Sequence, residues 1–350
     1  MSRLSRIFRT ISLSVTGVLL VMLVLTLLAP VMAPHVGLAR HRDSLPAPGT
    51  LVDISSTPGE VRALNVYAFG ASSNKFNPEK QQTIILAHGV PGSGNMMMPL
   101  ALALADQGFH TVTYDRLGWV HSTPRPTGEL ADPPHNANDL IALVEALNIE
   151  RPILLGYSYG GGVVQEVNRI APTLAACNVL LSSLGNGRPH RGQSTLGKII
   201  FSEPVMRWTL SMTPTAKAGS EGTMRALYYP DTAIPEAEWM TMLATLDSSV
   251  STWLREGNER WMAFEGFSPE AVIQPTLIIH GEQDAVVDVE VARQLADEIP
   301  HARAHYIAGM GHAAPLTHAD QIARLITAFV TAPADTFGCT QAEDIDRGAI

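Results

Sequence analysis

The chain has 350 residues, 46% of them hydrophobic and 16% charged, which is enough apolar material for one large α/β domain with an insertion or for two average domains. Its formal net charge of -9 argues against a nucleic-acid partner, because phosphate binding needs a concentrated basic surface and the sequence contains none. The two cysteines, Cys177 and Cys339, lie far apart, one in an apolar run and one in a polar tail, so we expect no structural disulfide. No cluster of Cys and His has the spacing of a metal site.

Residues 1–33 form a segment of their own. Arg3, Arg6 and Arg9 precede residues 11–33, which carry no charge. As a helix rising about 1.5 Å per residue, residues 11–29 alone would extend ~28 Å, close to the ~30 Å hydrocarbon core of a bilayer. A segment that is apolar on every side over this length is typical of membrane targeting or anchoring and does not belong to a soluble core.

The apolar run is long for the core of a signal peptide, which favours a retained single-pass anchor. Cleavage after Ala29, Ala33 or Ala39 would instead give a secreted protein. In either case the basic N-terminus should stay in the cytoplasm and place the remaining chain on the extracytoplasmic side. An interfacial helix is disfavoured, because the segment has no polar face. We therefore expect the membrane to be a partner of the protein through residues 1–33.

Residues 34–60 are rich in Pro, Ser and Gly and predict a linker that leads into the first strand. After it, short β-branched runs alternate with helical patterns. The runs predict strands at residues 61–69, 83–87, 110–114, 153–157, 179–183, 276–280 and 304–308. The helical patterns lie at residues 96–107, 136–147, 159–170, 287–298 and 319–330. This alternation predicts a mostly parallel sheet with helices on both faces, whose ligand site lies beyond the carboxyl ends of the strands.

Residues 185–266 interrupt the alternation, because they contain no good strand and are rich in Trp and Met. They stand between two predicted sheet strands, so this segment must leave the sheet and return, as a cap would. Its Trp and Met side chains either pack within the cap or face the site and bind an apolar substrate. The predicted core is thus divided into residues 61–184 and 267–330, and the polar, acidic residues 331–350 predict a loosely ordered tail.

The sequence G-Y-S-Y-G at residues 156–160 follows an apolar strand and opens a helical pattern. A nucleophile on a strand-to-helix turn takes strained backbone geometry, so the residues two positions away must be small, as Gly156 and Gly160 are. Ser158 is therefore the candidate nucleophile. Its oxygen should project above the sheet, and the amide of Tyr159 should point at a developing oxyanion.

Serine is a weak nucleophile and needs a base, which an acid in turn holds in place. His312 follows the last predicted strand within the sequence G-M-G-H and is the candidate base. Asp284 follows the strand at 276–280 within G-E-Q-D and is the candidate acid. Glu282 and Asp288 are nearby carboxylates, of which Asp288 is better placed to cap the next helix.

The loop after the strand at 83–87 has the sequence H-G-V-P-G-S-G. Its glycines would let backbone amides approach an oxyanion, so the amides of Val90 and Tyr159 are the candidate pair of donors. A phosphate cradle is the rival interpretation of this loop. It fails because the loop lacks a Walker lysine and does not have G-x-G-x-x-G spacing.

Together these segments resemble the α/β-hydrolase superfamily from about Val61 to Val330. The H-G-x-P loop, the G-x-S-x-G turn, the G-x-x-D segment and the final G-H occur with Ser before Asp before His, which is the order of that family. The resemblance implies an α/β fold with an eight-stranded, mostly parallel sheet and no cofactor. It also implies a helical cap, inserted after the sixth strand, at residues 185–266.

Residues 115–122 resemble the family's D-R-x-G-x-G-x-S turn, except that Val120 replaces the second glycine. This departure leaves the conformation of the turn open. Trp119 of the same turn is a candidate for the substrate pocket, together with His88 and Tyr157. Structural support of the catalytic turn is the alternative role of Trp119.

We expect a serine hydrolase that cleaves a carboxylic ester, or a related acyl bond, of a small apolar substrate through an acyl-enzyme. The same residues are compatible with hydrolysis of a lactone, an amide or a carbon–carbon bond, with acyl transfer, and with cofactor-free haloperoxidase or lyase chemistry. Epoxide and haloalkane hydrolases of this fold have a similar H-G-x-P loop, but they attack with a carboxylate, whereas Ser158 is a hydroxyl. A membrane-tethered binding protein without catalysis is the alternative from another class.

Overall fold

The computed structural model of the chain describes residues 45–57, 59–70, 82–186 and 266–332, together with residues 241, 242, 244, 245, 249, 252 and 339. The predicted membrane segment at 1–33, most of the predicted cap at 185–266 and most of the predicted tail at 331–350 lie outside these residues. Within the described ranges, no helix has both the length and the apolar character to span a membrane.

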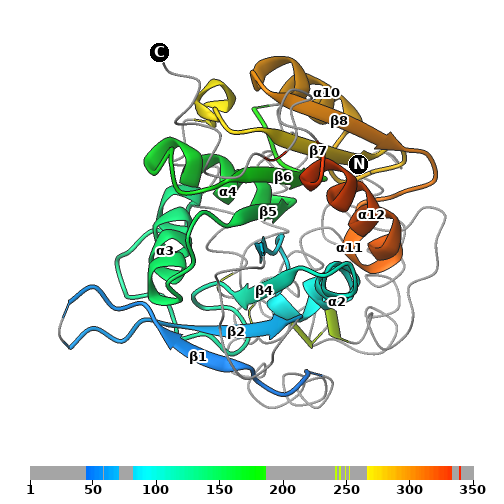
Figure 1. The fold of residues 1–350 in the computed structure, drawn as a ribbon. Coiled ribbons are helices and arrows are strands. Elements are labelled where there is room, and N and C mark those ends of the chain that lie inside the picture. Colours follow the sequence, from blue (N-terminus) through cyan, green and yellow to red (C-terminus); the bar gives the residue numbers. More distant parts are fainter. Residues whose placement is uncertain are drawn as a thin grey trace, which may run out of the picture.

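An eight-stranded sheet forms the centre of the fold (Figure 1). Its strands are β1 (Thr50–Asp53), β2 (Ala63–Phe69), β3 (Thr83–Ala87), β4 (His110–Asp115), β5 (Ile153–Tyr157), β6 (Cys177–Leu181), β7 (Thr276–Gly281) and β8 (Ala302–Ile307). They lie in the order β1-β2-β4-β3-β5-β6-β7-β8. The strands from β3 to β8 are parallel, whereas β1 and β2 pair antiparallel at one side. The carboxyl ends of the parallel strands therefore meet at one edge of the sheet.

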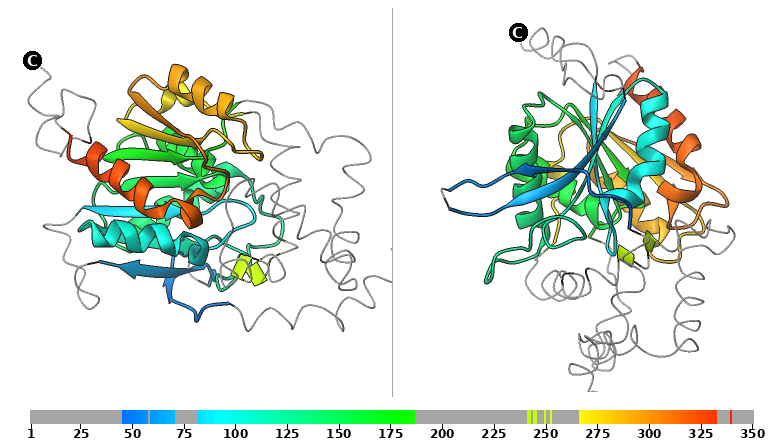
Figure 2. Two further views of the ribbon diagram at one scale, coloured as in Figure 1. Left: turned by 90° about the vertical axis from the view of Figure 1, so that its right-hand side faces the viewer. Right: turned by 90° about the horizontal axis from the view of Figure 1, so that it is seen from below.

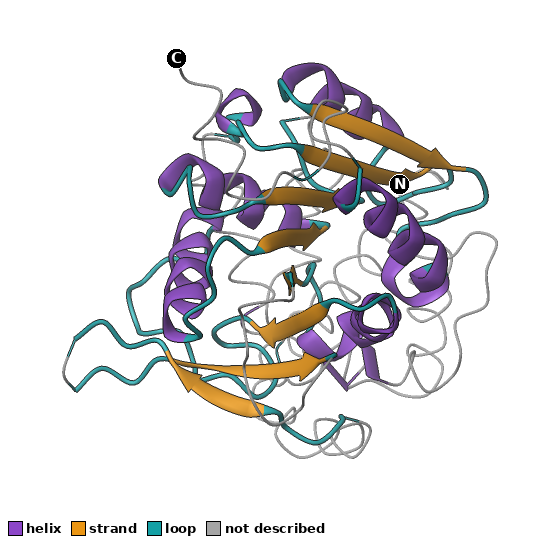
Figure 3. Cartoon of the chain, viewed as in Figure 1, coloured by secondary structure: helices purple, strands orange, loops and turns teal. Residues whose placement is uncertain are grey.

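Helices cover both faces of this sheet (Figures 2 and 3). One face carries α2 (Met98–Asp106), α11 (Ala314–Thr317) and α12 (Ala319–Val330), and the other carries α3 (Pro133–Ala146), α4 (Tyr159–Ile170) and α10 (Val289–Glu298). Two short 3-10 helices are η2 (Gly94–Met97) and η3 (Pro269–Ala271). Every residue of β3, β5 and β6 is buried, which explains why these strands have continuous apolar sequences rather than alternating ones. The predicted α/β fold with a mostly parallel sheet is confirmed.

The predicted linker at residues 34–60 is wrong in part, because it contains the strand β1. This strand pairs with β2 at the edge of the sheet, with Val52 opposite Leu64. Most of its side chains are exposed, and Leu51 is 58% exposed. A four-residue edge strand without a buried face has no alternation of apolar and polar residues, and that alternation is the pattern by which strands are predicted.

The expectation that the two cysteines stay apart is also wrong. Cys177, at the start of β6, and Cys339 form a disulfide with their Cα atoms 5.5 Å apart. Both residues are buried, and the N–H of Cys339 donates to the carbonyl of Phe329 near the end of α12. Cys339 thus lies at the amino end of β6. The predicted site lies at the other end of the strands, beyond their carboxyl ends. Sequence separation alone could not reveal this pairing, because it depends on where Cys339 lies in the folded protein.

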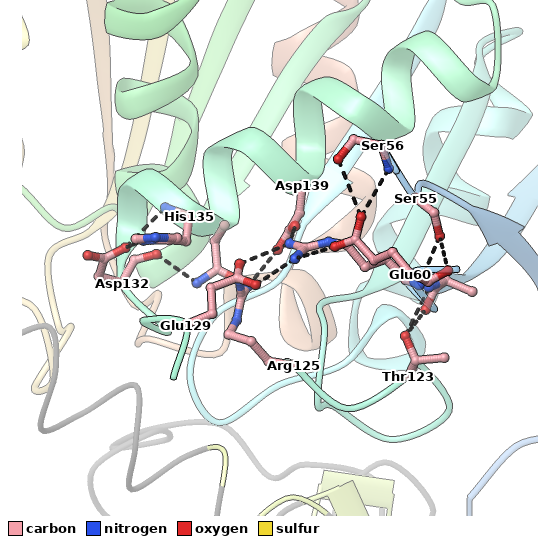
Figure 4. Close-up of polar contacts among 12 residues, drawn as sticks. Ser55, Ser56, Glu60, Thr123, Arg125, Glu129, Asp132, His135 and Asp139 are labelled. Atoms are coloured by element: carbon pink, nitrogen blue, oxygen red, sulfur yellow. Dashed lines mark hydrogen bonds and ion pairs between the residues drawn. The ribbon is translucent and has the colours of Figure 1, made fainter. Parts of the chain in front are cut away.

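A charged network fastens the loop after β4 to helix α3 and strand β2 (Figure 4). The buried side chain of Arg125 binds Asp139 at 2.5 Å and Glu129 at 2.7 Å. Arg62 binds the same two carboxylates from the β2 side. Removal of one partner would leave a buried charge uncompensated, so this network sets the path of the loop between β4 and α3.

Candidate active site

Ser158 lies on the sharp turn that joins β5 to α4. Its backbone angles are φ 53° and ψ -117°, in a region that residues other than glycine rarely adopt. The N–H of Ser158 donates to the carbonyl of Leu181 at 3.0 Å, so β6 helps to hold the turn. A Cβ on Gly156 would lie 2.3 Å from the oxygen of Gly160, and one on Gly160 would lie 2.1 Å from the oxygen of Ala87. Only glycine fits at these two positions.

The three predicted catalytic side chains meet beyond the carboxyl ends of β5, β7 and β8. The Nε2 atom of His312 lies 3.1 Å from Oγ of Ser158, and its Nδ1 atom lies 2.7 Å from Oδ2 of Asp284. All three residues are buried. Since Nδ1 of the neutral imidazole donates to Asp284, Nε2 faces Ser158 as an acceptor. The arrangement can therefore take the proton of Ser158 as its oxygen attacks.

The carboxylate of Asp284 has donors on both oxygens. Its Oδ1 accepts from the N–H groups of Val286 and Val287, each at 2.9 Å, and its Oδ2 accepts from His312. Burial on its own would raise the pKa of Asp284, but the electrostatic attraction and hydrogen bond of His312, the attraction of His280 and the Val287 amide lower this pKa below its usual value. Asp284 is therefore ionised and fixes the orientation of His312.

His280 is a second histidine beside Asp284, and the sequence motifs do not indicate it as a site residue. It lies in β7, is fully buried, and has Nε2 2.9 Å from the carbonyl of Val287 and 3.4 Å from Oδ2 of Asp284. Its ring thus holds the turn that carries the acid. The available signal was a histidine directly before the G-x-x-D segment. Because β7 is buried on both faces, no alternation indicated which of its side chains is near the site.

The H-G-V-P loop adjoins the nucleophile because β3 and β5 are neighbours, with Ala87 opposite Gly156. A Cβ on Gly89 would lie 3.0 Å from Cβ of Ser158, so the loop backbone is in contact with the serine. Tyr159 is the first residue of α4, so its amide belongs to the positive end of that helix. The use of the Val90 and Tyr159 amides as an oxyanion hole stays a prediction.

The predicted pocket residues His88, Trp119 and Tyr157 are buried. The hydroxyl of Tyr157 donates to the carbonyl of His312 at 2.9 Å, and the two rings lie 5.3 Å apart, so Tyr157 positions the base. The ring of His88 meets the ring of Trp119 edge-on at 5.6 Å. These contacts give all three side chains supporting roles, and their contact with substrate stays a prediction.

In the turn at residues 115–122, the valine that replaces the second glycine of the family motif has a left-handed backbone conformation. Val120 has a φ of 40°, although its side chain is branched at Cβ. The N–H of Val120 donates to Oγ of Ser249 at 3.0 Å, and Oγ1 of Thr252 donates to the carbonyl of Gly118 at 2.7 Å. Ser249 and Thr252 belong to the predicted cap, so cap residues hold the strained turn.

Two other carboxylates, Glu282 and Asp288, are near Asp284 in the sequence. Asp288 caps α10 by accepting from the N–H of Glu290 at 3.0 Å, as predicted. Glu282 is exposed to solvent. Among the residues that the structure describes, no group of His, Cys, Asp and Glu is arranged to hold a metal ion.

The two buried histidines His88 and His280 should make the fold sensitive to mild acid. Burial, together with the charge of Arg116, holds the pKa of His88 well below its usual value, and burial also lowers the pKa of His280 despite the attraction of Asp284. In the unfolded chain both rings would take up a proton below pH ~6.5. We expect the free energy of unfolding to fall by up to about 1.4 kcal/mol per pH unit for each such ring as the pH drops from about 6 to 5.

Urea unfolding at a series of pH values measures this slope. The lowered pKa of Asp284 adds nothing in this window, because its stabilisation is lost only when the pH falls below the ordinary range of aspartate. His88→Asn removes one of the two rings and should give a shallower slope than the wild type. An unfolding free energy that is the same at pH 7 and pH 5 would contradict the prediction.

A serine on a strand-to-helix turn, linked through a histidine to an aspartate above an eight-stranded, mostly parallel sheet, defines the α/β-hydrolase class. The chain belongs to the alpha/beta hydrolase family, whose model matches residues 84–325.

Individual proteins are similar to the chain over most of its length. A bifunctional esterase/perhydrolase of Acinetobacter calcoaceticus is 25% identical over 271 residues, covering 73% of this chain and 94% of the relative. A non-heme chloroperoxidase of Burkholderia pyrrocinia is 24% identical over 282 residues, with coverage of 73% and 94%. A thermophilic esterase from Thermogutta terrifontis has a similar structure, with a TM-score of 0.63 and 21% identity over 81% of this chain and 98% of that chain. At this identity the structural likeness shows the fold alone.

Proposed function

We propose that the protein is a serine hydrolase that cleaves a carboxylic ester, or a related acyl bond, of a small apolar molecule. The observation that carries the proposal is the series of hydrogen bonds from Ser158 through His312 to Asp284. A serine with this base and acid is an activated nucleophile, and its position beyond the strand ends is where ligands bind in such sheets.

Acylation begins when Oγ of Ser158 attacks the carbonyl carbon of the substrate and its proton passes to Nε2 of His312. The carbonyl oxygen becomes an oxyanion, which the amides of Val90 and Tyr159 stabilise. Collapse of this intermediate expels the alcohol, which takes the proton from His312. Asp284 remains ionised throughout and stabilises the imidazolium that forms between these two transfers.

Deacylation reverses the roles of the same groups. His312 takes a proton from water, and the hydroxide attacks the acyl carbon. The second oxyanion accepts hydrogen bonds from the same two amides. Its collapse releases the carboxylic acid and returns the proton to Ser158. Residues of the predicted cap support an apolar acyl group. The hydroxyl of Thr245 lies 3.3 Å from that of Ser93, in the loop that begins with H-G-V-P, so this part of the cap is next to that loop. The neighbouring Met242 and Ala244 are apolar and buried.

Hydrogen peroxide is a second candidate for the molecule that releases the acyl group. The two relatives described above are named a bifunctional esterase/perhydrolase and a non-heme chloroperoxidase, which favours this possibility. Peroxide would attack the same acyl carbon, His312 would take its proton, and a peroxy acid would leave. Formation of peroxy acid from an ester and hydrogen peroxide, compared with formation of acid in water, separates the two reactions.

A fluorophosphonate probe tests the proposed nucleophile. Oγ of Ser158 should displace fluoride from phosphorus and label the protein, and Ser158→Ala should remove both the label and the esterase activity. Ser182→Ala is a matched control, because Ser182 is also buried and also has a positive φ, of 44°. This control should be labelled like the wild type. Folded wild-type protein that takes up no probe would refute the proposal.

We further propose that the hydrolase domain works on the extracytoplasmic side of a membrane, tethered through residues 1–33. The positive charges before the apolar run favour this orientation. The Cys177–Cys339 disulfide supports the same location, because disulfides form and persist in oxidising compartments and are rare in the cytosol.

A further inference from the structure

Arg116 is a fully buried cation beside the H-G-V-P loop. It follows β4 and is 1% exposed. Its guanidinium carbon lies 4.6 Å from the ring centre of Tyr159 and 5.6 Å from that of Trp119. A charge placed between two aromatic faces in a region without solvent acts over a longer range than the same charge in water.

The guanidinium group of Arg116 contacts the backbone of the H-G-V-P loop. Its Nη1 donates to the carbonyl of His88, and Nη1 and Nη2 approach the carbonyl of Gly89 at 3.4 and 3.3 Å. The backbone N–H of Arg116 donates to Nε2 of His88 at 3.1 Å. The D-R segment after β4 and the H-G segment after β3 are therefore joined through one arginine.

The hydrogen bonds also fix the protonation of His88. Because Nε2 accepts from the N–H of Arg116, the neutral ring carries its proton on Nδ1, which donates to the carbonyl of Gly89 at 2.8 Å. Nη1 of Arg116 also lies 3.1 Å from Nδ1, and with this tautomer that approach is a contact between two donors and not a hydrogen bond. The ring is neutral, since burial and the charge of Arg116 lower the pKa of His88. The carbonyl of Gly89 thus accepts from His88 and is approached by Arg116.

This carbonyl belongs to the same peptide as the N–H of Val90. The C=O and N–H of a trans peptide point in opposite directions, so holding the Gly89 carbonyl toward Arg116 directs the Val90 N–H away from it. The peptide adjoins the nucleophile, because a Cβ on Gly89 would lie 3.0 Å from Cβ of Ser158. A hydrogen bond to the carbonyl also polarises the amide and strengthens the N–H as a donor.

We propose that Arg116, together with His88, is a positioning residue that orients and polarises the Gly89–Val90 amide as an oxyanion donor. The inference rests on the proposed serine-hydrolase function and names residues that its mechanism had not used. Arg116 touches neither the substrate nor the reacting atoms. It acts through the peptide, so its effect belongs to the oxyanion-forming steps and not to substrate binding.

Arg116→Gln tests the proposal with a chromogenic short-chain ester. The variant should show a kcat lowered by about tenfold or more, less than the ~10²–10³ that removal of a whole oxyanion donor costs, with KM within about twofold of the wild type. A trifluoromethyl ketone, which forms a tetrahedral oxyanion on Ser158, should bind weaker by the same factor as kcat/KM falls. A product carboxylic acid should bind unchanged.

Arg125→Gln is the matched control, because Arg125 is also a buried arginine, but its partners are Asp139 and Glu129 rather than the H-G-V-P loop. It should lose stability but keep the kcat and the ketone affinity of the wild type in its folded fraction. If both variants lose kcat equally, or if folded Arg116→Gln keeps the wild-type kcat, the proposal is overturned.

Arg116→Lys decides the question if Arg116→Gln does not fold. Lysine keeps the charge but cannot reach both carbonyls at once, so we expect kcat and ketone affinity to fall together by a few-fold. Unchanged values for both would overturn the proposal. Failure of the proposed function gives a different result, because the wild type itself would then take up no fluorophosphonate and hydrolyse no ester.

Discussion

Asp284→Asn should lower kcat by about 10⁴-fold while the domain stays folded. Asparagine can keep the two hydrogen bonds from the Val286 and Val287 amides through its oxygen. Its NH₂ group then faces Nδ1 of His312, which must become an acceptor. The ring proton moves to Nε2, which faces Ser158, so the base can no longer take the serine proton. Steady-state ester hydrolysis and a melting curve of the variant measure the two parts of this prediction.

Asp288→Asn is the control for this substitution. Asp288 lies four residues further on and caps α10 through the N–H of Glu290, so its replacement should leave kcat unchanged. Asparagine is itself a good N-cap residue, so the stability of this control should change little. Near-normal turnover by folded Asp284→Asn would show that another carboxylate, such as Glu282, serves as the acid.

Loss of the Cys177–Cys339 disulfide should lower the free energy of unfolding by about 2–5 kcal/mol. The bond joins residues 162 positions apart, and the cross-link restricts the unfolded chain more when the closed loop is long. We expect the melting temperature of the reduced protein, or of the variant Cys177→Ala/Cys339→Ala, to fall by roughly 5–15 °C.

The activity of this double variant at low temperature should match that of the wild type. The disulfide lies at the amino end of β6, whereas Ser158 lies beyond the carboxyl end of β5. The single variant Cys177→Ala serves as the comparison and should melt like the double variant. A melting temperature that does not respond to reductant would contradict the prediction. So would free thiols in wild-type protein that is denatured without reductant.

The sequence allowed the three predicted catalytic residues to be placed because each of them follows a strand that is recognisable by itself. Ser158, Asp284 and His312 are separated by many residues, yet each lies shortly after a strand of the parallel sheet. Strands β5 and β7, before Ser158 and Asp284, are fully buried, whereas β8, before His312, is partly exposed. Parallel strands end at one edge, so the order of the runs sufficed to predict that these side chains meet.

Other features depend on contacts that no local pattern encodes. Strand β1 has no buried face, so its sequence resembles that of a linker. The partner of Cys177 depends on the path of the tail, and the role of His280 depends on which side of a doubly buried strand faces Asp284. At Val120 the sequence departs from the glycine of the family motif, and the left-handed conformation is held by Ser249 of a distant segment.

The bond between Cys177 and Cys339 also divides the chain into a closed ring and an open arm. Asp284 and His312 lie within the ring, whereas Ser158 lies on the arm. The predicted cap at residues 185–266 is part of the ring as well, so one protease cut there would open the ring without releasing either half. Ser158 would remain covalently linked to Asp284 and His312 through the disulfide. A protein cut once by a protease within residues 185–266 should therefore keep its two fragments joined as long as the disulfide is intact.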